Sequence, residues 1–258
     1  MRILQIGCGN MGSAFLKVYS DTYGDINVVD RGFESEKFKI ARRLSDVESI
    51  DHFDLIILAI KPQDFDKISS EIGRYCGENT RVLSIMAMIS CSVIAEKLGV
   101  GCDKVGRTMP SLGIEKNIGV SLVLIDGGDV VLKEFCKLFG LNGNILVDVN
   151  SDADIDRITP LTGSGSAYFL LLADILANFA IEKFQLTPDL SIAVVKNLLK
   201  SSLDLCENTD FNSSIAKIAS KKGVTQAACD AMSDDFKNGV DSGMKAGETR
   251  AREFGKSN

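Results

Sequence analysis

The sequence has no tryptophan, only four prolines and a single histidine among its 258 residues. Because His52 stands alone, no serine–histidine–aspartate triad and no metal set can be built around it. The seven cysteines show no Cys-x-x-Cys or other metal-ligand spacing, and their number is odd. Met1-Arg2 leads directly into an apolar run, without the apolar core and cleavage site of a signal peptide. We therefore expect reduced, mostly buried thiols in a cytoplasmic protein without a bound metal.

Basic stretches and long hydrophobic runs are also scarce. The formal net charge is −6, and the pair Lys221-Lys222 is too short to neutralise a nucleic-acid backbone. The longest apolar stretch, residues 167–181, is interrupted by Asp174 and Asn178 and is too short to span a bilayer. We predict that this stretch forms a buried helix and that the protein has no nucleic-acid or membrane partner.

A glycine-rich turn near the N-terminus is the most informative feature of the chain. Gly7-Cys8-Gly9-Asn10-Met11-Gly12 follows the apolar run 3–6 and precedes a predicted helix over 13–19. The first glycine of such a turn permits a tight bend, the second lets a pyrophosphate approach, and the third lets helix and strand pack closely. A second predicted strand, 26–30, ends in an acid about 20 residues further on, where a ribose-binding carboxylate is expected. Together these features predict a nucleotide-binding βαβ unit.

Short apolar runs alternate with helical segments through the first 150 residues, which predicts a doubly wound, mostly parallel sheet of α/β class. We expect strands over residues 2–6, 26–30, 54–60, 81–85, 104–107, 119–125 and 145–149. No strand is expected from Ser151 onward. Helices are predicted there over 153–161, 163–184, 188–207, 213–219, 225–232 and 235–254. The expected domains are therefore a dinucleotide-binding domain, 1–150, and a helical domain, 151–258.

The predicted helix 163–184 is apolar on nearly every side, unlike a surface helix of a small domain. One interpretation is a dimer interface, in which a second chain covers the helix. The other is burial within the helical bundle of one chain. The pattern favours the dimer interface without deciding the matter.

Two further strand ends carry polar residues. Ile60-Lys61-Pro62 lies at the carboxyl end of a predicted strand, the edge where open α/β sheets bind ligands, so Lys61 is a candidate cofactor contact. Arg107-Thr108-Met109-Pro110 ends another strand. The predicted cofactor-binding residues are Ile6, Gly7, Cys8, Gly9, Asn10, Met11, Gly12, Asp30, Arg31, Ala59, Ile60, Lys61 and Pro62.

Five motifs in this order and at these separations resemble the pyrroline-5-carboxylate reductase family. They are residues 6–12, Ile60-Lys61-Pro62, residues 107–111, the junction 156–168 with Gly163-Ser164-Gly165, and residues 220–225. The resemblance spans nearly the whole chain. It implies a Rossmann-like domain followed by an all-α dimerisation domain that interleaves with a partner's, in a homodimer or larger homo-oligomer.

The resemblance also implies a reaction, the last step of proline synthesis. A reduced nicotinamide supplies a hydride to the C=N bond of 1-pyrroline-5-carboxylate and gives L-proline. By similarity, Thr225 is the catalytic residue and offers its hydroxyl to the ring nitrogen, although it could also merely cap a helix. The substrate-binding residues that the resemblance implies are Ser164, Gly165, Ser220, Gly223, Val224 and Thr225.

This chain departs from the family pattern at several positions. Lys221-Lys222 replaces Pro-Gly, Met88 stands where glycine is usual, and Ser166 and Ser111 replace Pro and Asn. Two adjacent residues give opposite indications of the cofactor. Asp30 favours a free ribose 2′-hydroxyl and repels a 2′-phosphate, whereas Arg31 could hold that phosphate. By similarity to the family we expect NADPH, with NADH also accepted.

Two alternative functions remain open at this point. A β-hydroxyacid dehydrogenase or another imine reductase would share this architecture. The former polarises a carbonyl with a helix lysine and a nearby asparagine, whereas Lys196 and Asn197 are adjacent here and point to different helix faces. A nucleotide-binding regulator would require a decayed catalytic loop at Lys221-Lys222, but Gly223 and Thr225 are both present.

Overall fold

The computed structural model describes residues 1–47 and 52–256, which divide into two compact units. Unit 1 comprises residues 1–163 and the end of the chain from Gly247, and unit 2 comprises Ser164–Ala246. The last strand ends at Asp148, and from Asp152 onward the regular elements are helices, close to the domain boundary predicted near residue 150. Unit 1, however, continues to Gly163.

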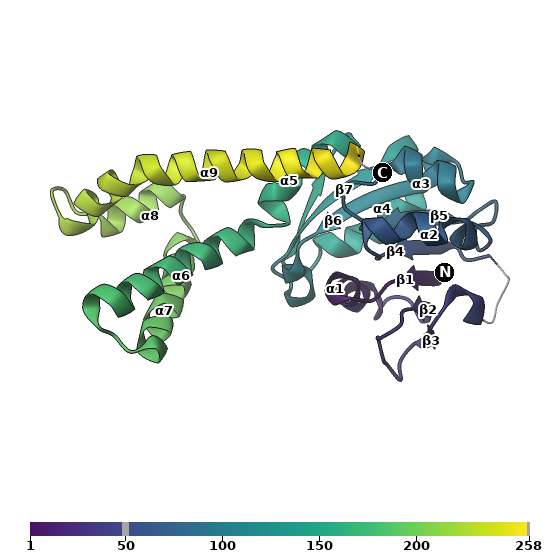
Figure 1. Cartoon of the computed structure of the whole chain (residues 1–258), viewed down its shortest axis with the longest axis horizontal. Helices are drawn as coiled ribbons and strands as arrows, with labels where there is room; N and C mark the ends of the chain where they lie inside the picture. Colours follow the sequence, from purple (N-terminus) through teal and green to yellow (C-terminus); the bar gives the residue numbers. More distant parts are fainter. Residues whose placement is uncertain (48–51, 257–258) are drawn as a thin grey trace. The chain divides into compact units, whose positions relative to one another are not determined.

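Unit 1 is built on one twisted sheet (Figure 1), which has eight strands within the described residues, in the order β3-β2-β1-β4-β5-β6-β7-β8. Neighbouring strands are parallel except β6 and β7, which are antiparallel. The predicted mostly parallel, Rossmann-like sheet is therefore confirmed. The strands are β1 (Arg2–Ile6), β2 (Asp25–Val29), β3 (Lys39–Ala41), β4 (Leu55–Leu58), β5 (Arg81–Ser84), β6 (Val105–Pro110), β7 (Val120–Ile125) and β8 (Ile145–Asp148).

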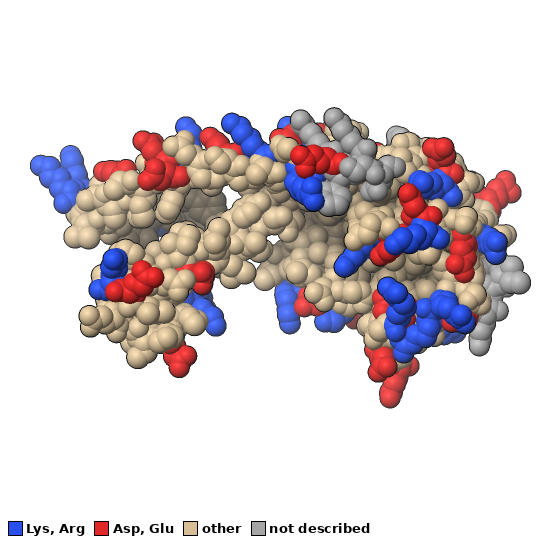
Figure 2. Space-filling model, viewed as in Figure 1, with Lys and Arg blue, Asp and Glu red and all other residues tan. Residues whose placement is uncertain are grey.

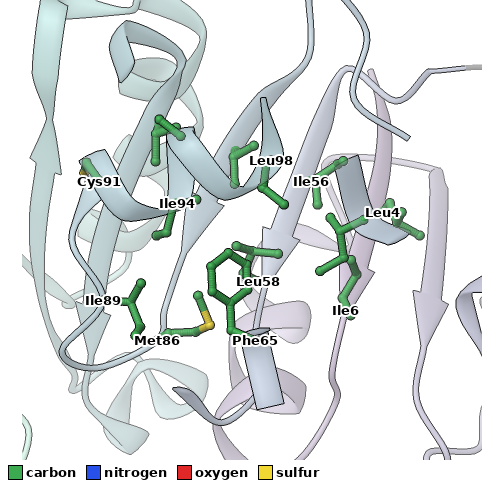
Figure 3. Packing of buried hydrophobic residues seen from close by; sticks show 14 of the residues in the cluster. Leu4, Ile6, Ile56, Leu58, Phe65, Met86, Ile89, Cys91, Ile94 and Leu98 are labelled. Carbon is green, nitrogen blue, oxygen red and sulfur yellow. The ribbon is translucent and has the colours of Figure 1, made fainter. Parts of the chain in front are cut away.

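Helices cover both faces of this sheet, because successive side chains of each strand point to opposite sides. Leu4 and Ile6 of β1 pack with α2 (Pro62–Gly73), α3 (Cys91–Leu98) and α5 (Asp152–Thr162). Figure 3 shows this side, where Phe65 and Ile94 meet Leu58 of β4. The opposite side packs against α1 (Asn10–Tyr19) and α4 (Val130–Lys137).

The sequence pattern missed strand β3 of unit 1, whereas helix α4 lies between β7 and β8, where the alternation predicts a helical segment. Strand β3 has only three residues and pairs with β2 alone, which is too short for a periodic signal. Helix α4 buries only Leu132, Phe135 and Cys136, and its start depends on the Asp129 carboxylate, which caps the amide of Leu132 at 2.9 Å.

Unit 2 is helical and leaves most of its apolar side chains exposed. It contains α6 (Gly165–Phe184), α7 (Pro188–Cys206), α8 (Phe211–Ile218) and the start of α9 (Val224–Lys256). Helix α9 is continuous, whereas the sequence predicted two helices in this region. Helices α6 and α7 pack together, and the Ser191 hydroxyl donates to the Ala177 carbonyl at 2.7 Å.

Helix α6 is not buried by its own chain. Ala177 is its only buried residue, and the structure describes the whole helix. Phe169, Leu170 and Leu171 are 60 to 68% exposed, and Figure 2 shows broad uncharged surface on this face of unit 2. The predicted buried helix and the interpretation as a one-chain bundle are therefore wrong for the isolated chain. By length and composition alone, the stretch Asp152–Phe184 is also apolar enough to cross a membrane, with 17% of its most apolar window buried.

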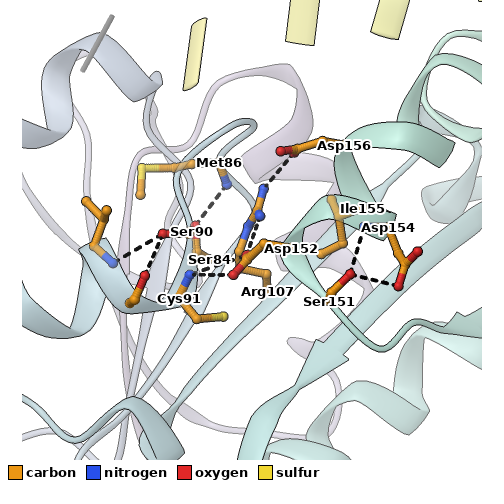
Figure 4. A network of polar contacts seen from close by, with 12 residues as sticks. Ser84, Met86, Ser90, Cys91, Arg107, Ser151, Asp152, Asp154, Ile155 and Asp156 are labelled. Carbon is orange, nitrogen blue, oxygen red and sulfur yellow. Dashed lines mark hydrogen bonds and ion pairs between the residues drawn. The ribbon is translucent and has the colours of Figure 1, made fainter. Parts of the chain in front are cut away.

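A buried arginine links three elements of unit 1 (Figure 4). The Arg107 side chain on β6 is 1% exposed and forms ion pairs with Asp152 and Asp156 on α5. The Asp152 carboxylate also accepts a hydrogen bond from the amide of Cys91, the first residue of α3, at 3.2 Å. Burial raises the pKa of Asp156 above its usual value, although the charge of Arg107 opposes this shift. This network attaches α5 to the sheet and to α3.

We expect Arg107→Met to lower the free energy of unfolding by about 3 to 5 kcal/mol, because it leaves two partly buried carboxylates without their cation. The matched control is Arg157→Met on α5, the helix that carries Asp152 and Asp156. Arg157 is 65% exposed and pairs with Asp154 at the surface, so its loss should cost under about 1 kcal/mol. Denaturant unfolding of both variants measures the difference, and equal losses would contradict the proposed importance of Arg107.

Candidate functional site

The glycine turn between β1 and α1 has the geometry that its sequence predicts. Gly7 has a φ of +92°, and its amide donates to the Val29 carbonyl on β2 at 2.8 Å. An added Cβ at Gly7 would lie 2.5 Å from the Ala59 carbonyl oxygen, and one at Gly12 would lie 2.8 Å from that of Gly7. An added Cβ at Gly9 would meet nothing within 4 Å. Gly7 and Gly12 therefore allow the chain to pack, while Gly9 leaves one side of the turn open.

A buried glutamine, which the sequence analysis overlooked, supports this turn from below. The side-chain nitrogen Nε2 of Gln5 donates hydrogen bonds to the carbonyls of Gly7 at 2.9 Å and Gly12 at 3.0 Å. The Tyr19 hydroxyl, at the end of α1, donates to the Gln5 side-chain oxygen at 2.7 Å. A glutamine within an otherwise apolar strand was the available signal, since a fully buried amide requires hydrogen-bonding partners.

The start of α1 is open to an anion. Gly9 is the N-cap residue and provides no side-chain hydrogen bond, and the first turn contains no acidic residue. The amides of the first turn have no partner within the helix, and they carry the positive end of its dipole. Together with the exposed surface at Gly9, this helix start suits a phosphate group.

A cavity of about 520 Å³ lies beside the turn, at the carboxyl ends of β1, β2 and β4. Among the predicted cofactor residues, Ile6, Gly7, Asp30, Arg31 and Ile60 line it. Cys8, Asn10, Met11 and Ala59 belong to the turn and its immediate surroundings. Lys61, the N-cap residue of α2, and Pro62, its first residue, lie outside the lining. Four cations also line the cavity, namely Arg31, Arg42, Arg43 and Lys67.

Three of these cations have acidic partners at the surface, and one of the three is Arg42, which lies 3.5 Å from the Glu34 carboxylate. Arg43 pairs with Asp46 at 3.1 Å, and Lys67 pairs with Asp64 at 3.0 Å. Arg31 has no ion pair among the described residues. The carboxylates Asp30, Asp64 and Glu71 also line the cavity, so Arg31 is the cation of the lining that is left without an ion pair and is suited to bind an additional phosphate of a nucleotide.

Cys8 and the other thiols contribute no nucleophile to this cavity. Burial, together with the charge of Asp30, raises the pKa of the Cys8 thiol to about 12. The seven cysteines form no disulfide, and no group of three metal-binding side chains occurs within residues 1–47 and 52–256.

The predicted substrate residues lie in unit 2 at two helix starts. Ser164 precedes α6, and its carbonyl accepts the amide of Ala167 at 2.8 Å. Gly223 precedes α9, where Thr225 is half-buried in the first turn. The Gly223 amide donates to the Ser220 carbonyl at 2.8 Å, which closes the turn 220–223. In Figure 1, α6 and α9 begin at opposite ends of unit 2, so one chain does not bring these two groups together.

Two residues that replace family glycines keep a left-handed backbone. Lys222 has a φ of +60° and Met88 a φ of +66°. An L-residue pays about 1 to 2 kcal/mol for this conformation, which the surrounding structure must compensate. The turn before α9 therefore has the backbone conformation suited to glycine despite the Lys221-Lys222 substitution.

Comparisons with known proteins cover both parts of the chain. Residues 152–254 match the family model "Pyrroline-5-carboxylate reductase dimerisation", and residues 2–88 match "NADP oxidoreductase coenzyme F420-dependent". Pyrroline-5-carboxylate reductase of Aquifex aeolicus is 29% identical over 87% of this chain and 86% of its own length. The enzyme of that name from Staphylococcus haemolyticus is 26% identical over 90% of this chain and 89% of its own.

Solved structures share the fold over nearly the full length. Pyrroline carboxylate reductase of Plasmodium falciparum with NADP bound has a TM-score of 0.82 at 20% identity and covers 99% of this chain and 98% of its own. 1-Pyrroline-5-carboxylate reductase of Streptococcus pyogenes has a TM-score of 0.80 at 24% identity, covering 98% of both chains. Prephenate dehydrogenase of Aquifex aeolicus, bound to NAD⁺, has a TM-score of 0.54 at 15% identity, with 100% and 96% covered, so related folds extend to other reactions.

The geometry of the glycine turn yields a stability test. Gly7→Ala should cost about 3 kcal/mol or more, because it adds a methyl group against the Ala59 carbonyl at a strained φ. Gly9→Ala should cost less than about 1 kcal/mol, the loss of a favourable N-cap residue. Thermal unfolding of the two variants measures this difference. A similar loss in both would mean that Gly9 is as closely packed as Gly7.

Proposed function

Because the chain belongs to the pyrroline-5-carboxylate reductase family, we propose that it transfers a hydride from NADPH to the C=N bond of 1-pyrroline-5-carboxylate and releases L-proline. The observation that carries this proposal is the occurrence, in one chain, of an open glycine turn beside a cationic cavity and of a C-terminal region matching the dimerisation domain named for this enzyme.

The residues of unit 1 fit a dinucleotide. The amides at the start of α1 would hold its pyrophosphate on the open side of Gly9, and Ile6 and Ile60 would contact its apolar parts. Arg31 would bind the 2′-phosphate, which favours NADPH, while NADH remains usable without that contact. When bound, the reduced nicotinamide supplies the hydride, so the protein's task is to orient the imine and to support its protonation.

The start of α9 supplies groups suited to the substrate. The amides of Val224, Thr225 and Gln226 precede the first hydrogen bond of α9 and would bind the substrate carboxylate. Lys221 and Lys222 add positive charge beside them, and no acidic residue occupies the first turn. The Thr225 hydroxyl would donate a hydrogen bond to the ring nitrogen, which becomes an amine when the imine carbon gains the hydride and the nitrogen gains a proton from solvent. Ser164 and Gly165 would complete the substrate contacts.

The functional form that we propose is a homodimer or larger homo-oligomer in the cytoplasm. Its supports are the exposed apolar surface of α6 and the separation of Ser164-Gly165 from Thr225 within one chain. In this arrangement residues 1–150 bind the dinucleotide, and residues 151–258 provide the dimer contact and the substrate groups.

The direct test is to mix the purified chain with 1-pyrroline-5-carboxylate and to follow NADPH and NADH oxidation separately. We expect Thr225→Ala to reduce kcat about a hundredfold while NADPH binding changes little, because one preorganised donor to the reacting centre is lost. Thr225→Ser keeps the hydroxyl and should retain most of the activity. Equal losses in both variants, with matching losses of thermal stability, would identify Thr225 as a helix cap only.

Oligomerisation has its own test. Leu170→Glu should shift the protein towards monomer in sedimentation velocity and abolish most turnover, because it places a charge in the apolar surface that the partner covers. Ile118→Glu is the matched control, since Ile118 is 78% exposed in unit 1, and it should leave assembly unchanged. A wild-type chain that sediments as a fully active monomer would contradict this part of the proposal.

A further inference from the structure

We infer that Asp30 acts as a positioning residue, whose carboxylate holds the glycine turn and the adjacent turn 31–33 in place around the dinucleotide without itself binding the ribose or the 2′-phosphate. The inference rests on the proposed function, because it assigns to this chain a dinucleotide in the cavity beside Asp30. It also replaces the role that the sequence pattern suggested, in which Asp30 selects between NADH and NADPH.

Hydrogen bonds already engage both oxygens of the Asp30 carboxylate. Oδ1 accepts the amides of Gly32 and Phe33, each at 2.8 Å. Oδ2 accepts the amide of Cys8, inside the glycine turn, at 2.7 Å. A carboxylate that binds a ribose diol needs both oxygens, whereas here Oδ1 has both lone pairs in use. Asp30 therefore connects two segments of backbone that border the same cavity.

The turn 31–33 is also held through its carbonyl groups. Nη1 of Arg42, just after β3, donates to the carbonyls of Phe33 at 2.8 Å and Arg31 at 3.2 Å. Its Nη2 lies 3.5 Å from the Glu34 carboxylate. Asp30 thus binds the amides of this turn and Arg42 binds its carbonyls, so the backbone that carries Arg31 is fixed from both sides.

The charge of Asp30 is stabilised by these contacts. Burial alone would raise its pKa, but the amides of Gly32, Cys8 and Phe33 and the charge of Arg31 outweigh burial and lower the pKa below its usual value. Asp30 is therefore ionised across the neutral range, and its hydrogen bonds are charge-assisted. Since the glycine turn, which Asp30 holds through the Cys8 amide, would contact the pyrophosphate of NADPH and NADH alike, loss of Asp30 should affect both cofactors.

Asp30→Asn separates the two roles with a nearly isosteric change. If the side-chain oxygen of the asparagine occupies the Oδ1 position, it keeps the hydrogen bonds from the amides of Gly32 and Phe33. The side-chain NH₂ group then faces the N–H group of Cys8, and two donors cannot form a hydrogen bond. We expect the dissociation constants of both NADPH and NADH to rise about tenfold, with their ratio changing less than about threefold. Hydrogen exchange of the Cys8 amide should accelerate in the cofactor-free protein, which a selectivity role for Asp30 would not require.

Binding is measured by the fluorescence of the reduced nicotinamide, so the result does not depend on turnover of 1-pyrroline-5-carboxylate. Arg31→Ala is the control for selectivity and should weaken NADPH binding about tenfold while NADH binding is retained. A wild-type chain that binds NADPH but does not reduce the imine would refute the proposed reaction and leave the role of Asp30 standing.

Three results would overturn the inference. One is a tenfold or greater gain in NADPH preference in Asp30→Asn, which would show that the carboxylate repels the 2′-phosphate directly. Another is unchanged binding of both cofactors together with unchanged exchange at Cys8. The third is the absence of dinucleotide binding by the wild-type chain, which would remove the ligand that Asp30 is inferred to serve.

Discussion

The buried charge of Arg107 is the constraint on which the arrangement of unit 1 depends. A guanidinium that is 1% exposed cannot stay unpaired, so β6 requires Asp152 and Asp156 to lie over it. Those carboxylates belong to α5, and Asp152 also meets the first amide of α3. One charge therefore attaches the last helix before unit 2 to the sheet. This explains why unit 1 extends through α5 to Gly163, past the point where strands give way to helices.

At the cofactor cavity, too, polar side chains fix a segment of backbone, in this case the segment that a ligand would contact. Gln5 binds the carbonyls of the glycine turn from inside the sheet, and Asp30, which directly follows β2, binds its Cys8 amide. Neither contact leaves the turn free to adopt another shape. The open side at Gly9 and the partnerless amides of α1 are consequently available to an anion without rearrangement of the turn, which is the preorganisation that tight binding requires.

Unit 2 presents the opposite situation, because its apolar surface has no partner within the chain. Phe169, Leu170 and Leu171 are exposed on a helix that buries only Ala177 of its own residues, all of which the structure describes. Burying one such side chain contributes about 1.5 to 3 kcal/mol, so a second copy has a large driving force to cover several of them. The domain match over 152–254 bears the name of a dimerisation domain, in agreement with this surface.

The sequence alone determined the glycine turn, the alternating strands and helices, and the family, because each depends on local patterns that the order of residues displays directly. It also indicated that a second surface must cover helix 163–184.

Tertiary structure decided the features that depend on residues distant in the sequence. Strand β3 is visible only through its pairing with β2, and the role of Gln5 only through the carbonyls of Gly7 and Gly12. The pattern suggested a ribose contact at Asp30, whereas the fold directs its carboxylate to amides at positions 8, 32 and 33. A sequence shows which residues can form hydrogen bonds, but the fold determines which partners lie within reach.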